Sequence, residues 1–194
     1  MAKSDPGHDA LTAPLPLDLW TPSPPALTAP LDSWLTEPGL LTERLRTLST
    51  APLRLRVVRQ GLIGAETVAS APFDLGAGNV FVREIELCVD GTAFIFAQTL
   101  VPDATLARFP WLAELGDSPL GETLSVLDGI SRAAFEYALL PAIHPLASTA
   151  ERELPEAARA TVPARRATVS LRGLPILVQE LFLPALGRAI GVAA

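Results

Sequence analysis

Residues 80–102 read VFVREIELCVDGTAFIFAQTLVP, and this stretch decides the fold class. Val80 to Val89 is rich in β-branched and apolar residues that alternate with charged ones, which predicts a strand. Asp90-Gly91 is a favoured two-residue hairpin turn, and Thr92 to Val101 predicts the returning strand. The stretch therefore predicts an antiparallel β-hairpin.

More strands and several short helices surround this hairpin. The pattern of Leu53 to Arg59 predicts one strand, and Ala167–Arg172 and Ile176–Leu183 predict two more with a turn at Gly173-Leu174-Pro175. Helices are predicted over Leu40–Leu48, over Thr105–Leu115 with a break at Pro110, from Ser118-Pro119 onward and over Ile130–Leu140. Because the helices fall between groups of strands, the fold class is α+β with an antiparallel sheet.

The N-terminal segment differs from the rest in composition. Residues 1–30 contain seven prolines and no clear periodicity, so we expect an irregular arm there. Residues 31–194 are then expected to form a single domain.

Composition excludes several classes of function. The net charge of −6 argues against a nucleic-acid surface, and the single cysteine, Cys88, cannot form an internal disulfide. The start of the chain shows no signal peptide, and no apolar run is long enough for a membrane span. The two histidines stand apart from other metal ligands. We expect a cytoplasmic monomer without a metal or another cofactor.

Two charged residues lie on apolar strand faces. Side chains alternate along a strand, so Arg83 shares a face with Phe81 and Ile85, while Glu84 and Glu86 are expected to look outward. By the same rule, Glu180 shares a face with Val178 and Phe182, and the last strand is apolar on both faces. An unpaired buried charge is costly. Arg83 and Glu180 therefore either form a structural ion pair, with each other or with other side chains, or line a buried pocket.

The segment GDSPLGE at 116–122 resembles a helix start, with Ser118 as the N-cap and Pro119 as the first helical residue. Such an end leaves the amides of Leu120 and Gly121 free to bind a carboxylate. Pro38-Gly39-Leu40-Leu41 offers a similar free amide.

Several of these segments resemble the chorismate lyase family. The similarity is carried by VREIELCVDG at 82–91, TLVP at 99–102, LGDSPLG at 115–121, LRGLPIL at 171–177 and ELFLP at 180–184. It extends over about residues 33–186. The resemblance implies an antiparallel sheet of about six strands with helical flaps over an enclosed site.

The resemblance also implies a site. Arg83 would bind the carboxylate of the aromatic product 4-hydroxybenzoate, assisted by the backbone amides of Leu120 and Leu41, and Glu180 would bind its hydroxyl. The substrate would be chorismate, and the reaction would release pyruvate in the first committed step towards ubiquinone. Family members often have a basic residue at the position of Gln98. Arg132, Arg165 and Arg166 are candidates to replace it, although the sequence does not place them.

Two other readings stay open at this point. By resemblance, the ligand-sensing domains of some bacterial transcription regulators share the expected fold, so the chain could be a non-catalytic module that binds a small aromatic acid. An interaction protein without a ligand is the third reading, and it leaves Arg83 and Glu180 unexplained.

Overall fold

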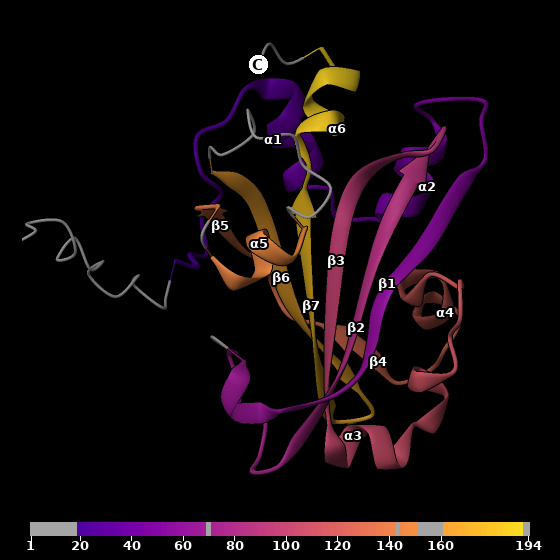
Figure 1. Ribbon diagram of the computed structural model, residues 1–194, viewed down its shortest axis with the longest axis vertical. Helices are drawn as coiled ribbons and strands as arrows, with labels where there is room; N and C mark the ends of the chain where they lie inside the picture. Colours follow the sequence, from indigo (N-terminus) through magenta and orange to yellow (C-terminus); the bar gives the residue numbers. More distant parts are fainter. Residues whose placement is uncertain (1–18, 69–70, 143, 151–160, 192–194) are drawn as a thin grey trace, which may run out of the picture.

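The computed structural model describes residues 19–68, 71–142, 144–150 and 161–191. Within these ranges one antiparallel sheet runs through the molecule in the order β1-β2-β3-β7-β6-β4, and β5 also pairs with β6 (Figure 1). The strands are β1 (Leu53–Gly64), β2 (Asn79–Val89), β3 (Thr92–Pro102), β4 (Ile130–Arg132), β5 (Glu136–Leu140), β6 (Val162–Leu171) and β7 (Leu174–Phe182). The α+β class is confirmed. Because β4 and β5 share one edge of β6, the seven strands make a sheet six strands wide.

Both predicted hairpins are present. Asp90 and Gly91 have φ angles of 50° and 75°, which is the left-handed geometry of a two-residue turn. The second turn lies at Arg172-Gly173, with φ angles of 50° and 92°, and not at the predicted Gly173-Leu174-Pro175. A two-residue turn of this kind matches the twist of the strands, so Leu174 and Pro175 already belong to β7.

The register of β2 and β3 shifts close to their turn. Cys88 pairs with Ala93, but Leu87 pairs with Ile95, so Phe94 is an extra residue on β3. Because of this β-bulge, Thr99 lies opposite Arg83, where Gln98 would lie in a regular ladder.

The predicted helix over Ile130–Leu140 is wrong, because this segment forms β4 and β5. Its partner strand β6 begins at Val162, five residues before the predicted start, and offers a long edge of backbone donors and acceptors. Ala138 and Leu140 are buried against this edge, while Leu139 points outward. Pairing with β6 has overridden the helix preference of the Ala- and Leu-rich segment.

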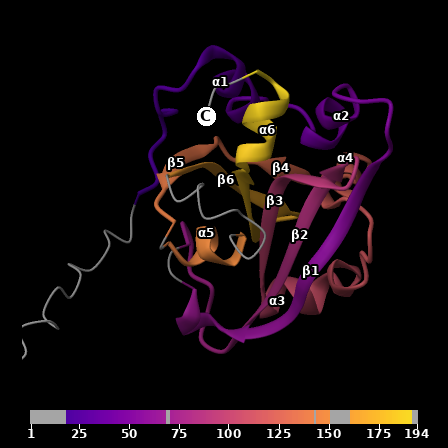
Figure 2. The ribbon, with the colours of Figure 1, turned by 45° about the horizontal axis from the view of Figure 1, so that its top comes forward.

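Short helices cover both faces of the sheet (Figures 1 and 2). They are α1 (Ala29–Leu35), α2 (Leu41–Arg46), α3 (Asp103–Arg108), α4 (Leu120–Ser125), α5 (Pro145–Ala150) and α6 (Pro184–Ala189), with 3₁₀ turns at Ala65–Thr67 and Pro110–Ala113. Side chains of α1, α2 and α6 pack with Ile85 and Phe182 on one face, and α5 packs with Phe96 and Leu181 on the other. Strand β7 is thus covered on both sides, as predicted. No helix of the described residues is long and apolar enough to span a membrane.

Glu84 and Glu86 lie on the face opposite Arg83 but do not look outward. Both are buried, with 0% and 2% of their surface exposed. Arg59 and Arg56 of the neighbouring β1 reach over them and pair with their carboxylates. The expectation of solvated glutamates is therefore wrong, because long arginine stems can cover a buried carboxylate while their heads stay in water.

Strand β1 is an edge of the sheet, since β2 is its only partner strand in the described part of the chain. Its register against β2 shifts between Val57 and Arg59, and it carries arginines at 54, 56 and 59.

Residues 1–18 of the predicted arm lie outside the described residues. From residue 19 the chain packs on the sheet: Trp20 is buried beside Leu140 and Leu181, and its ring lies 4.6 Å from the Arg166 guanidinium carbon. Backbone hydrogen bonds of 2.9 and 2.8 Å join Thr21 to Tyr137 of β5.

We predict that Trp20→Ala lowers the free energy of unfolding by about 3–5 kcal/mol, because it removes a large buried side chain. Urea denaturation monitored by circular dichroism measures this loss. Val126→Ala is the control, since Val126 is 81% exposed and its truncation should change stability by less than about 0.5 kcal/mol. Equal stabilities of the two variants would contradict the packing described for Trp20.

Candidate active site

A cavity of about 480 Å³ lies on the sheet face that carries Arg83 and Glu180. Its floor comes from β2, β3, β6 and β7, and its walls come from the starts of α2 and α4 and from residues 127–135. Most lining side chains are apolar, which gives a site where charged groups interact strongly. The size is that of a small-molecule site.

Arg83 is a buried cation of this cavity, with only 2% of its surface exposed. Its Nη2 donates to the backbone oxygens of Gly116 (2.8 Å) and Ser118 (3.1 Å). Its Nε is buried without a partner in the described part of the chain. Burial lowers the pKa of Arg83, although a guanidinium stays charged at neutral pH. The side chain is thus held in place while donors remain for an anionic ligand.

The predicted amides of Leu120 and Leu41 belong to two adjacent helix starts. Leu120 is the first residue of α4 and Leu41 is the first residue of α2, and both line the cavity. The N-cap of α4 is Pro119, one residue later than predicted, because Pro119 adopts an extended conformation. Amides in a first helical turn have no acceptor within the helix.

Gly121 lies where the two helix starts approach each other. A Cβ atom at this position would lie 3.0 Å from Leu40 Cδ2, so the end of the Leu40 side chain would have to shift by a few tenths of an ångström. Arg46 of α2 also pairs with Glu122 of α4 at 2.8 Å. Helices α2 and α4 therefore form one wall, visible in Figure 2.

Glu180 does not pair with Arg83. Its Oε2 accepts a hydrogen bond of 2.6 Å from Nε of Arg165, on the neighbouring strand β6. The Glu180 side chain is 20% exposed and that of Arg165 only 2%. Glu180 thus has Arg165 as its ion-pair partner, and Arg83 has no ion-pair partner among the described residues. Both carboxylate and guanidinium still line the cavity.

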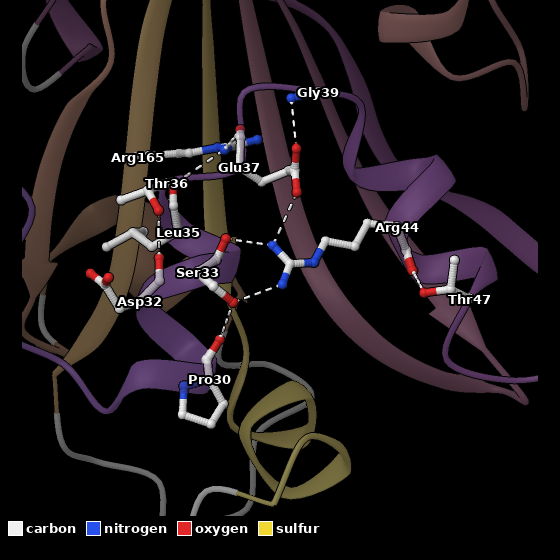
Figure 3. A network of polar contacts seen from close by, with 10 residues as sticks. All are labelled: Pro30, Asp32, Ser33, Leu35, Thr36, Glu37, Gly39, Arg44, Thr47 and Arg165. Carbon is white, nitrogen blue, oxygen red and sulfur yellow. Dashed lines mark hydrogen bonds and ion pairs between the residues drawn. The ribbon is translucent and has the colours of Figure 1, made fainter.

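Arg165 also fixes the segment that leads into α2 (Figure 3). Its Nη1 donates to the backbone oxygens of Leu35 (3.2 Å) and Glu37 (2.5 Å). The Glu37 carboxylate in turn accepts from the Gly39 amide at 2.9 Å and from Arg44 at 3.1 Å. One buried guanidinium therefore links the Glu180 carboxylate to the chain that presents Leu41.

Gln98 lies outside the cavity. It faces the other side of the sheet, where its Nε2 donates to Glu84 Oε1 and its Oε1 accepts from Gln179, each at 2.9 Å. The expectation that a cation at this position would serve the site is not supported in this chain, because the β-bulge at Phe94 turns residue 98 away from Arg83.

The three arginines proposed to replace it separate into two groups. Arg165 and Arg132 line the cavity, and Nη2 of Arg132 donates to Pro38 O at 2.6 Å. Arg166 points to the opposite face, where it pairs with Glu136 at 2.7 Å and contacts Trp20. Cys88 is buried, as predicted.

A largely apolar cavity with a buried arginine on an antiparallel sheet defines a small-molecule site for an anion. Residues 18–190 match the family model described as chorismate lyase, and the chain belongs to this family.

Named relatives agree with this assignment. A probable chorismate pyruvate-lyase of Ralstonia nicotianae is 42% identical over 57% of this chain, and the match spans 58% of that relative's length. A probable chorismate pyruvate-lyase of Dechloromonas aromatica is 38% identical over 71% of this chain and 78% of its own. The chorismate pyruvate-lyase of Erwinia tasmaniensis is 32% identical over 86% of both chains.

The fold also occurs in a solved structure of another kind. The effector domain of PhnF from Mycobacterium smegmatis has a TM-score of 0.51 and 18% sequence identity, covering 74% of this chain and 88% of that one. This likeness concerns the fold alone.

We predict that Arg165→Met lowers the free energy of unfolding by about 3 kcal/mol or more, because it leaves the Glu180 carboxylate and two backbone oxygens unpaired. Adding Glu180→Met should recover part of this loss, which chemical denaturation of the single and double variants measures. Arg46→Met is the control: it breaks a pair with Glu122 in which the side chains are 49% and 34% exposed, and it should cost at most about 1 kcal/mol. Equal losses in Arg165→Met and Arg46→Met would contradict this role of Arg165.

Proposed function

We propose that this protein eliminates pyruvate from chorismate and leaves 4-hydroxybenzoate, the first committed step towards ubiquinone. The observation that carries the proposal is the buried guanidinium of Arg83, which lines the cavity, is held by two carbonyls and has an Nε without a partner among the described residues. A buried donor without an acceptor is costly unless a ligand supplies one. The family assignment identifies chorismate as the ligand to test first.

In this proposal Arg83 binds the ring carboxylate of the substrate. A guanidinium matches a carboxylate through two parallel N–H groups, which fixes the orientation of the ring. The amides of Leu120 and Leu41, at the starts of α4 and α2, supply further donors. Arg83 also holds the loop before α4 through Gly116 and Ser118, so the same side chain positions the Leu120 amide.

Glu180 is proposed to meet the ring hydroxyl. In the described residues only its Oε2 is hydrogen-bonded, and Oε1 remains for the substrate. The reaction removes the hydrogen from the ring carbon that bears the hydroxyl and breaks the ether C–O bond at the adjacent carbon. The electron pair of the C–H bond enters the ring, which becomes aromatic, and the enolpyruvyl group leaves and takes up a proton to give pyruvate. Glu180 is placed to accept the ring proton or to orient the hydroxyl.

Placement and charge stabilisation are then the main demands on the protein. We propose that it needs no metal or other cofactor and acts as a cytoplasmic monomer.

The direct test is to mix the purified protein with chorismate in the presence of EDTA and to follow 4-hydroxybenzoate and pyruvate by chromatography. We expect the two products in equal amounts. A ligand-sensing module of the same fold would instead bind 4-hydroxybenzoate without consuming chorismate. That outcome would overturn the proposed activity.

We predict that Arg83→Met lowers kcat/KM for chorismate and the affinity for 4-hydroxybenzoate, because the buried carboxylate anchor is lost. Each decrease should correspond to a free-energy loss of about 2–4 kcal/mol. Steady-state kinetics and calorimetric titration with the product measure the two effects. Arg108→Met is the matched control, since Arg108 lies over Phe109 outside the cavity. Unchanged kinetics in a folded Arg83→Met variant would exclude the anchor.

We predict that Glu180→Gln lowers turnover by about 100-fold or more, within the usual contribution of a general base. Glutamine keeps the size of the side chain and can still meet the hydroxyl, so binding of 4-hydroxybenzoate should survive. Turnover, product affinity and melting temperature are measured on one preparation. A stable variant that binds product and turns over normally would limit Glu180 to its ion pair with Arg165.

A further inference from the structure

The charges that line the cavity do not balance. They are Arg83, Arg132, Arg165 and Glu180, so three cations face one anion and the described lining carries a net charge of +2. The chain as a whole carries −6. A cavity that is locally positive in an acidic protein is complementary to a ligand with two negative charges.

The strand register places these charges along the cavity. Arg83 pairs with Thr99, which pairs with Val178, whereas Glu180 lies two residues further along β7 and pairs with Arg165 on β6. Arg132 is on β4, beyond β6, and interacts electrostatically with both Arg165 and Glu180. Strands β3 and β7 lie between β2 and β6, and adjacent strands are about 4.8 Å apart. Arg83 is therefore the one charged residue on its side of the described cavity lining. The other two arginines gather around Glu180.

The geometry of chorismate matches this order, if the proposed function holds. Its hydroxyl lies across the ring from the ring carboxylate, and the enolpyruvyl ether is on the carbon next to the hydroxyl. A substrate with its ring carboxylate on Arg83 and its hydroxyl on Glu180 therefore brings its second carboxylate to the side of Arg132 and Arg165. The product 4-hydroxybenzoate has no second carboxylate.

The hydrogen bonds distinguish the two arginines. Arg165 is buried, and its Nε and Nη1 are already bonded to Glu180 and to two backbone oxygens. Arg132 is exposed at the rim and forms a single hydrogen bond within the described residues, to Pro38 O. Both guanidinium carbons lie over the ring of Phe135, at 4.3 Å for Arg132 and 4.2 Å for Arg165. Desolvation, and then the nearby Arg165, lower the pKa of Arg132, and a bound anion would relieve this cost.

We propose that Arg132 binds the enolpyruvyl carboxylate of the substrate, while Arg165 positions Glu180. Arg132 thus contacts a group that the substrate has and the aromatic product lacks. It discriminates chorismate from 4-hydroxybenzoate at the same site.

The test compares substrate and product in Arg132→Gln. We expect KM for chorismate to rise about 10- to 100-fold, the loss of one charged contact, while the Kd for 4-hydroxybenzoate changes less than about 3-fold. Arg132→Lys, which retains the charge, should lie between Arg132→Gln and the unchanged protein. Arg108→Gln is the matched control, because Arg108 also lies over a phenylalanine ring but outside the cavity.

Two results would overturn the inference. A KM within about 3-fold of that of the unchanged protein would show that Arg132 does not contact the substrate, whereas an equal loss of affinity for chorismate and 4-hydroxybenzoate would show a general effect on the site. Melting temperatures identify a variant that is merely unfolded, in which case Arg132→Lys decides the question. Failure of the proposed function is distinguishable, since the unchanged protein would then form no 4-hydroxybenzoate.

Discussion

A full positive charge lies under the helices of this protein, at Arg83 in the middle of β2, and much of the surrounding structure follows from its burial. A buried guanidinium must be hydrogen-bonded or meet an anion. Gly116 and Ser118 satisfy one nitrogen and thereby fix the loop before α4, while Nε has no partner in the described part of the chain and the residue lines the cavity. The Arg46–Glu122 pair then joins α2 to α4, so that two helix starts share the wall. The site is built outward from one strand residue.

The second half of the site depends on a different buried arginine. Arg165 holds the Glu180 carboxylate on one side and the carbonyls of Leu35 and Glu37 on the other. Sequence position alone gives no indication of this arrangement, because the three contacts come from β7, from the last residue of α1 and from the chain between α1 and α2. The two arginines have different roles in the proposed mechanism. Arg83 binds the ligand, and Arg165 holds in place the protein groups that contact the ligand.

How far the sequence predicts the structure depends on whether the signal is local. The β2–β3 hairpin, the faces of Arg83 and Glu180 and the helix start near Leu120 follow from alternation and turn residues within short segments. The β4 and β5 strands could not be predicted, since their edge partner β6 lies about 30 residues away and its own start is hidden in an Ala- and Arg-rich segment. The face of Gln98 depends on one extra residue in the ladder, Phe94, and an unbulged two-residue hairpin would have placed Gln98 opposite Arg83. The side chain at this sequence position would therefore lie on opposite faces of the sheet in proteins with and without the bulge.

Strand β1 shows how an open edge of the sheet can be protected from pairing with other molecules. An edge strand of twelve residues, Leu53–Gly64, with Val57, Val58 and Leu62 exposed, is a template on which strands of other molecules could add. The register shift between Val57 and Arg59 interrupts the regular spacing of its free backbone groups, and the arginines at 54, 56 and 59 would meet like charges in a second copy aligned with it. Arg56 and Arg59 neutralise the buried Glu86 and Glu84 from the same positions. The two arginines thus neutralise buried carboxylates and also oppose edge-to-edge aggregation by repelling like charges.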